Sequence, residues 1–160
     1  MNDYAYTGLA AIGWREWLSL PELGIPQIKA KVDTGARTSA LHACYVKPFR
    51  KRGVRMVRFG IHPLQRRKDV IIDCTATVID RRDVTDSGGH REMRYVIETL
   101  ATLGNVTWRV ELTLTNRDTM RFRMLLGRTA MEERFVVVPS ASYLLGQRAP
   151  RRRNPAASPR

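Results

Sequence analysis

The residues best suited to chemistry lie between positions 28 and 40, which read Ile-Lys-Ala-Lys-Val-Asp-Thr-Gly-Ala-Arg-Thr-Ser-Ala. An alternation of apolar and polar residues, typical of a strand, ends at Asp33, so this carboxylate stands where it can exchange a proton with water or substrate. Thr34 can hydrogen-bond across a loop, and Gly35 lets the backbone turn and approach another chain closely. Asp-Thr-Gly is also common in ordinary turns, so by itself it leaves both interpretations open.

A second motif, at residues 124–131, favours the chemical interpretation. It reads Met-Leu-Leu-Gly-Arg-Thr-Ala-Met. The apolar pair Leu125 and Leu126 is followed by Gly127 and Arg128, where a short helix is predicted to begin. The two motifs together resemble those of the retropepsin-like aspartic peptidases, which combine Asp-Thr-Gly-Ala with a later apolar-apolar-Gly-Arg strand and helix.

The stretch 33–43, Asp-Thr-Gly-Ala-Arg-Thr-Ser-Ala-Leu-His-Ala, is similar to a narrower bacterial group. That group is often labelled "ATP-dependent zinc protease" and is associated with RimK-type glutamate ligases of the ATP-grasp class. The resemblance covers roughly residues 12–145. It implies an association with a glutamate ligase and a glutamate-modified polypeptide as the substrate. The basic residues expected around the cleft independently predict an acidic substrate.

The resemblance also implies an aspartic endopeptidase mechanism. Two carboxylates about 3 Å apart share one proton, because like charges that close cannot both ionise, and together they activate a water molecule. The chain supplies one convincing strand-end Asp-Thr-Gly, so we expect a two-fold homodimer in which Asp33 meets its symmetry mate. The loop expected to hold the carboxylates and line the cleft consists of Thr34, Gly35, Ala36, Arg37, Thr38 and Ser39.

A charged neighbour bears on this mechanism. By strand alternation, Lys31 points to the same side as Asp33. There its ammonium group would favour the ionised carboxylate and oppose proton sharing, unless the side chain turns back to solvent.

A glycine-bearing segment predicts a flap over the substrate. Ser87, Gly88, Gly89 and His90 are expected at the tip of a hairpin, which is where retropepsins carry their flap. Asp-Ser-Gly at residues 86–88 could alternatively be a second catalytic motif in a monomeric site. We reject that alternative because the segment leading into it is highly charged and because it follows too soon for a second lobe.

No metal or cofactor is predicted. His42, His62 and His90 are isolated from one another, no His-Glu-x-x-His occurs, and the thiols are limited to Cys44 and Cys74. Zinc needs three or four such ligands brought together. No glycine-rich phosphate-binding loop is present either, so the chain gives no support to ATP dependence.

The positive charge of the chain is unevenly distributed. The formal net charge is +13, and residues 45–68 hold nine Lys and Arg with no acidic residue. This block is either a solvated face or a surface that attracts anions. The alternative function is therefore a catalytically inactive basic barrel that binds a glutamate-ligase partner or nucleic acid, although sparse aromatic residues make nucleic acid a weak prediction.

The elements that must position these residues are mostly strands. Alternating or β-branched apolar residues predict strands at 12–20, 27–32, 54–61, 70–79, 93–99, 106–115, 121–126 and 135–138. A helix is predicted at 128–134, directly after Leu125-Leu126-Gly127. We expect an all-β fold, a closed barrel of six or more strands with one short C-terminal helix.

The domain boundaries follow from the same patterns. An N-terminal extension is predicted at 1–11, the peptidase domain at 12–145 and a disordered Arg/Pro-rich tail at 146–160. No segment has the length and apolarity of a membrane span, and no secretory signal is recognisable, so a cytoplasmic protein is expected.

Overall fold

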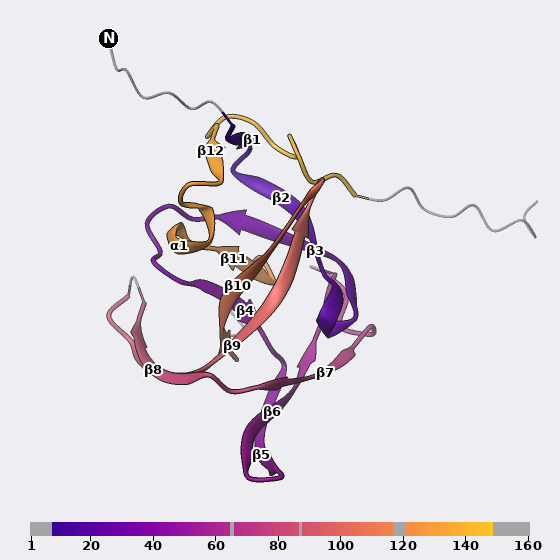
Figure 1. Cartoon of the computed structure of the whole chain (residues 1–160), viewed down its shortest axis with the longest axis vertical. Helices are drawn as coiled ribbons and strands as arrows, with labels where there is room; N and C mark the ends of the chain where they lie inside the picture. The colour runs from indigo at the N-terminus through magenta and orange to yellow at the C-terminus, as the bar shows by residue number, and fades with distance from the viewer. Residues whose placement is uncertain (1–7, 65, 87, 117–120, 149–160) are drawn as a thin grey trace, which may run out of the picture.

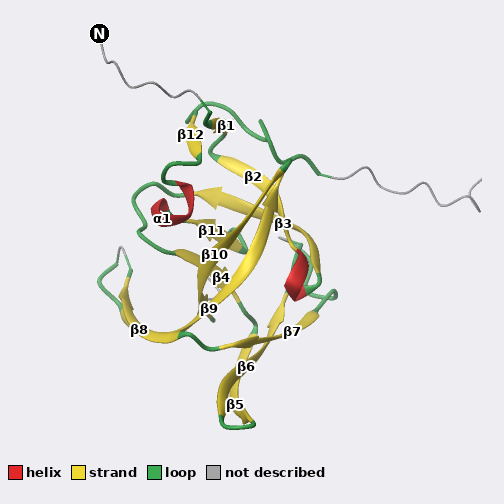
Figure 2. Ribbon diagram, in the orientation of Figure 1, coloured by secondary structure: helices red, strands yellow, loops and turns green. Residues whose placement is uncertain are grey.

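The computed structural model describes residues 8–64, 66–86, 88–116 and 121–148, and the fold is almost entirely β (Figures 1 and 2). The strands are β1 Ala10–Ile12, β2 Arg15–Leu20, β3 Ile25–Val32, β4 Ser39–His42, β5 Tyr45–Lys51, β6 Val54–Ile61, β7 Ile72–Thr77, β8 Asp80–Thr85, β9 Arg91–Leu103, β10 Val106–Thr115, β11 Met124–Leu126 and β12 Phe135–Val137. The helical turns are the 3-10 turn η1 Pro21–Leu23 and the helix α1 Arg128–Met131.

Six of these strands form a closed barrel. Their order is β10-β4-β11-β3-β2-β9, and β9 pairs back with β10 to close the ring. The predicted all-β barrel with one short C-terminal helix is confirmed. The seventh strand of this sheet, β8, extends it beyond β9 and is not part of the ring.

The barrel forms where the sequence alternates. In β10, Trp108, Val110 and Leu112 are buried, whereas Arg109 and Glu111 are exposed between them. Such a strand stabilises the fold because its apolar side chains leave water while its charged ones stay solvated. The structure has β10 and β6 at the residues predicted for them.

Three strands, β4, β5 and β8, were not predicted from the sequence, for different reasons. All four residues of β4 are buried, so this central strand shows no alternation. Both β5 and β8 contain no buried residue, because each lies at the edge of its sheet. A strand without a buried face gives no period-two signal in the sequence.

A second sheet projects from the barrel. Strands β5, β6 and β7 form it, and Figure 1 shows the β5–β6 hairpin extending away from the rest of the molecule. Arg52 and Gly53 connect these two strands with φ of 51° and 78°. Two successive residues with positive φ form the tight turn whose twist matches that of antiparallel strands.

The segments at the two ends of the described chain pack against the barrel. Strand β1 pairs in parallel with β12, so Ala10 and Ala11 of the predicted extension lie in a strand. Of the predicted tail, Gly146 accepts a hydrogen bond from the Trp17 amide, while residues 149–160 lie outside the described part. Within the described residues, no helix is long and apolar enough to cross a membrane.

Candidate active site

The backbone brings the two sequence motifs together beside Asp33. Strands β3 and β11 run parallel, with Val32 opposite Leu126. One residue further on, the Asp33 amide donates to the Leu126 carbonyl at 2.9 Å. The end of the carboxylate-bearing strand is therefore fixed by the Leu-Leu pair of the second motif.

The loop after β3 orients the Asp33 carboxylate. Its Oδ1 accepts the amide hydrogens of Gly35 at 3.0 Å and Ala36 at 3.2 Å. A Cβ at Gly35 would lie 3.3 Å from this oxygen, so the close approach suits glycine. Within the described residues no hydrogen bond reaches Oδ2, and the side chain is half-buried. One carboxylate oxygen is thus held by the loop, while the other has hydrogen-bonding capacity left for a water, a substrate or a second carboxylate.

The second motif also supports the loop through Gly127. The Gly127 amide donates to Ser39 Oγ at 2.9 Å. A Cβ on Gly127 would lie 2.6 Å from the carbonyl carbon of Thr38 and 2.8 Å from the Ser39 nitrogen. These distances are shorter than any normal contact, so only glycine allows the two segments to approach this closely.

Helix α1 completes the support. The Arg128 amide donates to the Ala36 carbonyl at 2.7 Å, and its Nη1 donates to the Thr34 carbonyl at 3.0 Å. Thr129 then donates to the Arg37 carbonyl from both its amide, at 3.0 Å, and its hydroxyl, at 2.9 Å. The loop carbonyls are thus held by the turn that begins at Gly127.

The loop residues predicted from the sequence differ in exposure. Thr34, Gly35 and Arg37 are exposed, Thr38 is half-buried and Ser39 is buried at the start of β4. The Ser39 hydroxyl supports the loop rather than lining a surface. Lys31 is exposed and lies opposite Arg15 across the β2–β3 pair.

The expected flap segment lies between β8 and β9. These strands form an antiparallel hairpin whose tip is closed by Asp86, since its Oδ1 accepts the His90 amide at 2.8 Å. Gly89 has φ of 83° and donates to the Asp86 carbonyl at 3.1 Å. Gly88 and His90 belong to the same turn, and Ser87 lies outside the described residues.

Sequence reasoning missed a buried polar network that connects this hairpin to the loop. Arg94 on β9 is 8% exposed. Its guanidinium donates to Glu92 at 3.1 Å and to Thr113 Oγ1 at 3.3 Å. The Thr113 hydroxyl in turn donates to the Ser39 carbonyl at 3.3 Å. The available signal was the charged pair at alternate positions 92 and 94 of a strand that is otherwise mostly apolar.

The residues do not fit a zinc site. Among the described residues no group of three or more His, Cys, Asp or Glu side chains could hold a metal ion. His42 is buried and its Nδ1 lies 3.4 Å from Arg123 Nη1, which is a poor neighbourhood for a cation. Burial, with a smaller contribution from Asp73, raises the pKa of the Cys74 thiol to about 12. Zinc binds the thiolate, and this environment opposes its formation.

The architecture and the loop define a class of protein. A closed six-stranded barrel carries an Asp-Thr-Gly-Ala loop at the end of one strand, and a Leu-Leu-Gly-Arg corner holds that loop through hydrogen bonds. This combination is the retropepsin-like fold. A solved structure of a Legionella pneumophila protein of unknown function shares the fold, with a TM-score of 0.71 at 24% identity over 84% of this chain and 97% of that chain.

The chain belongs to the RimB-like family, which is described as "Retropepsin-like aspartic endopeptidase RimB" and matches residues 11–148. Two similar curated proteins are both called "Probable alpha-L-glutamate ligase". The one from Shewanella halifaxensis is 52% identical over 85% of this chain, and the one from Desulfotalea psychrophila is 47% identical over 85%. The chain spans only 30% and 29% of their respective lengths.

Proposed function

We infer that this protein is an aspartic endopeptidase that works as a homodimer, with Asp33 of each subunit as the paired acid and base. The observation that carries the proposal is the support of Asp33. One carboxylate oxygen accepts two loop amides, and the strand end is held by the Leu126 carbonyl. The family description supports the same reaction class.

The chemistry follows from two such carboxylates facing each other. At about 3 Å they share one proton, since two negative charges that close cannot coexist. The ionised Asp33 takes a proton from a water molecule, and that water attacks the carbonyl carbon of the peptide bond. The protonated Asp33 of the other subunit donates its proton to the carbonyl oxygen. Proton transfer to the leaving nitrogen then breaks the C–N bond and releases an amine and a carboxylic acid.

The substrate class that we propose is an acidic polypeptide, with glutamate-modified chains as the leading candidates. The formal net charge of +13 favours negatively charged partners. The similar curated proteins named as glutamate ligases are about three times as long as the matched segment, which supports a functional association between this domain and glutamate ligation.

The direct test of the reaction replaces Asp33 by asparagine. We expect Asp33→Asn to lower the rate of peptide cleavage by at least about 100-fold, because asparagine cannot transfer the proton. The matched control is Asp83→Asn, which makes the same change on an exposed side chain of β8. Cleavage that survives in Asp33→Asn, or falls equally in the control, would rule out the proposed role of Asp33.

Substrate preference needs a separate comparison. Cleavage of glutamate-extended peptides is measured against peptides of equal length extended with glutamine. Faster cleavage of the glutamate series supports the acidic substrate class. Equal rates would remove that class while leaving the peptidase reaction intact.

A further inference from the structure

A pocket of about 300 Å³ lies outside the ring of barrel strands. It forms where the projecting β5–β6 hairpin meets the start of β8. The connection between the two sheets is held there on both sides, because the Val78 amide donates to the Arg55 carbonyl at 3.0 Å and the Ile79 amide donates to Val96 at 2.9 Å. The pocket is therefore built on fixed backbone, although its residues come from two sheets.

Two arginines face each other in this pocket without a compensating acid. Arg50 on β5 and Arg55 on β6 are direct cross-strand partners, and both line the cavity. Like charges in directly opposed positions destabilise a sheet. Within the described residues, no carboxylate lies within ion-pair distance of either guanidinium. By contrast, Arg82 on β8 pairs with Glu111 on β10, and Arg109 on β10 pairs with Glu98 on β9.

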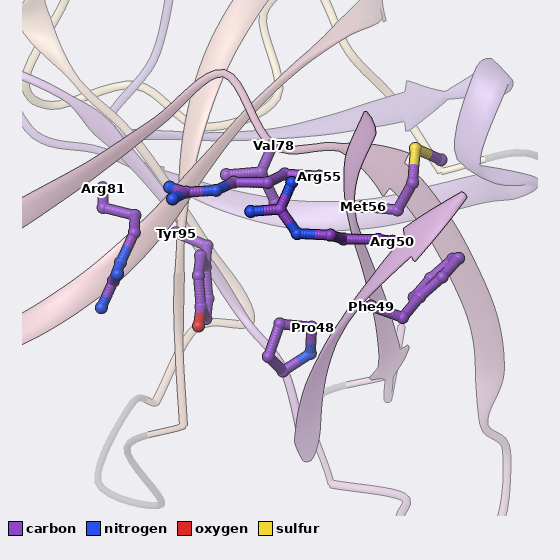
Figure 3. A pocket seen from close by; sticks show the side chains of 8 residues that line it. All are labelled: Pro48, Phe49, Arg50, Arg55, Met56, Val78, Arg81 and Tyr95. Carbon is purple, nitrogen blue, oxygen red and sulfur yellow. The ribbon is translucent and has the colours of Figure 1, made fainter. Parts of the chain in front are cut away.

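A third arginine enters from the β8–β9 side. The guanidinium of Arg81 lies 5.7 Å from the centre of the Tyr95 ring, and it too has no carboxylate partner in the described part of the chain. Figure 3 shows Arg50 and Arg55 reaching toward Tyr95 from one side, with Arg81 beyond the ring. Three unneutralised guanidinium groups thus surround one cavity that has an aromatic wall.

The remaining walls are largely apolar. Pro48 and Val78 line the pocket beside the Tyr95 ring. Phe49 and Met56 also border it, but they are the cross-strand pair next to the two arginines and point to the other face of the hairpin. A glutamate side chain has a carboxylate end and an apolar stem, so it matches a site that offers arginines beside hydrocarbon. Arginine binds carboxylates through two parallel hydrogen bonds, which makes it better suited than lysine to such recognition.

We propose that this pocket is a binding site for an acidic polypeptide segment, separate from the Asp33 loop. Arg50, Arg55 and Arg81 bind its carboxylates, while Pro48, Val78 and Tyr95 contact the apolar stems. The pocket is open to solvent, and its volume of about 300 Å³ is at the lower end for ligand pockets, so it suits a few side chains. Single-stranded nucleic acid instead needs a groove with a series of stacking aromatic rings.

Strand β9 separates this site from the candidate active site. Tyr95 lines the pocket, whereas its neighbour Arg94 is buried in the network that reaches Ser39. Neighbouring residues of a strand point to opposite faces. The inference does not rest on peptidase activity, because binding can be measured with Asp33→Asn protein whether or not the wild type cleaves peptides.

The test measures binding of fluorescein-labelled octaglutamate to residues 1–160 carrying Asp33→Asn, by fluorescence anisotropy. In this background, Arg50→Gln/Arg55→Gln is compared with Lys47→Gln/Lys51→Gln. The second pair removes the same charge from the same hairpin. Lys47 and Lys51 lie on β5 at positions whose side chains point to the opposite face from Arg50. We expect the arginine variant to weaken binding at least tenfold and the lysine variant to weaken it less than threefold.

Three outcomes would overturn the proposal. One is the absence of octaglutamate binding, and another is equal weakening in the two variants, which would mean general charge attraction. The third is tighter binding of a labelled single-stranded octanucleotide that depends on the same two arginines. Circular dichroism of each variant checks the fold, and Arg81→Gln provides an independent variant outside the hairpin, expected to weaken binding in the same direction.

Discussion

At the scale of single residues, the candidate site depends on glycine as much as on the carboxylate. Asp33 supplies the charge, but its position depends on how closely the strand–helix corner approaches the loop. Gly127 sits where a side chain would overlap the backbone of Thr38 and Ser39. The approach also lets the Gly127 amide reach the Ser39 hydroxyl. The corner between β11 and α1 is thereby held against the start of β4.

We therefore expect Gly127→Ala to destabilise the protein by about 1–3 kcal/mol, the usual range for overpacking a tightly packed site. The loss arises because the added methyl group must push apart two backbone segments. It is measured as the change in the free energy of unfolding in urea. Peptidase activity, where present, should fall further than stability alone explains, since the Asp33 loop moves.

The matched control for this prediction is Gly88→Ala. There the nearest atom to an added Cβ is His90 Nδ1 at 3.2 Å, at the end of an exposed side chain that can move away. A change close to zero is expected. Equal effects of the two substitutions would show that the packing at Gly127 is not special.

The residues of the loop could be predicted from sequence because the motif is local. Asp33 to Ala36 are neighbours along the chain, and the hydrogen bonds to Oδ1 join residues at most three positions apart. The network from Arg94 to Ser39 joins different strands of the sheet. Such a contact depends on strand order and register, and neither can be inferred from one sequence with confidence.

At the scale of elements, the segment that follows β12 is fastened by one buried carboxylate. Glu16 on β2 is fully buried and accepts the amide hydrogens of Leu144, Leu145 and Gly146 at 3.0, 2.7 and 2.9 Å. These bonds compensate the charge for its loss of water. Residues 144–146 are thus held against β2, although the structure assigns no strand or helix to them.

Removing residues 144–148 takes away the amides that bind the Glu16 carboxylate and should therefore destabilise the fold. A chain ending at Tyr143 is expected to lose about 3–5 kcal/mol of unfolding free energy relative to one ending at Arg148, as when one partner of a buried charged pair is removed. Thermal or urea unfolding measures the difference. Glu16→Gln in the shortened chain should recover part of the loss, because a neutral amide costs less to bury. Failure of glutamine to recover stability would contradict the electrostatic explanation.

Strands with one buried face could be predicted from the sequence, whereas strands buried throughout or exposed throughout could not. Strands β6 and β10 have alternating or strongly apolar inner faces, and their limits agree with the sequence prediction. The four-residue β4 is surrounded by neighbours on both sides, and its small and polar residues carry no strand signal. Tertiary contacts override local preference in such a strand.

At the scale of the whole molecule, the proposed reaction requires two copies of the chain. Each subunit has one Asp33, supported by its own strand–helix corner. A dimer built this way makes every active site a shared property of two subunits. Mixing subunits can therefore distinguish a shared site from two independent ones.

Equal amounts of wild-type and Asp33→Asn protein, unfolded together and refolded, should give about one quarter of the activity of the same total amount of wild type if both carboxylates are needed. Independent sites would give about one half. The measurement is the initial rate of peptide cleavage, with light scattering to establish that the mixed sample is dimeric. Refolded wild type alone corrects for losses in recovery, and activity near one half would rule out the shared site.

Closing the barrel leaves β8 as the free edge of the main sheet, and β5 is one of the two edges of the three-stranded sheet. Exposed edges invite strand-to-strand addition and aggregation. Here β8 begins Asp-Arg-Arg-Asp, and β5 carries lysines, an arginine and Pro48, which cannot donate a ladder hydrogen bond. The same polar composition that concealed both strands from sequence analysis therefore protects the folded protein from fibril-like stacking at high concentration.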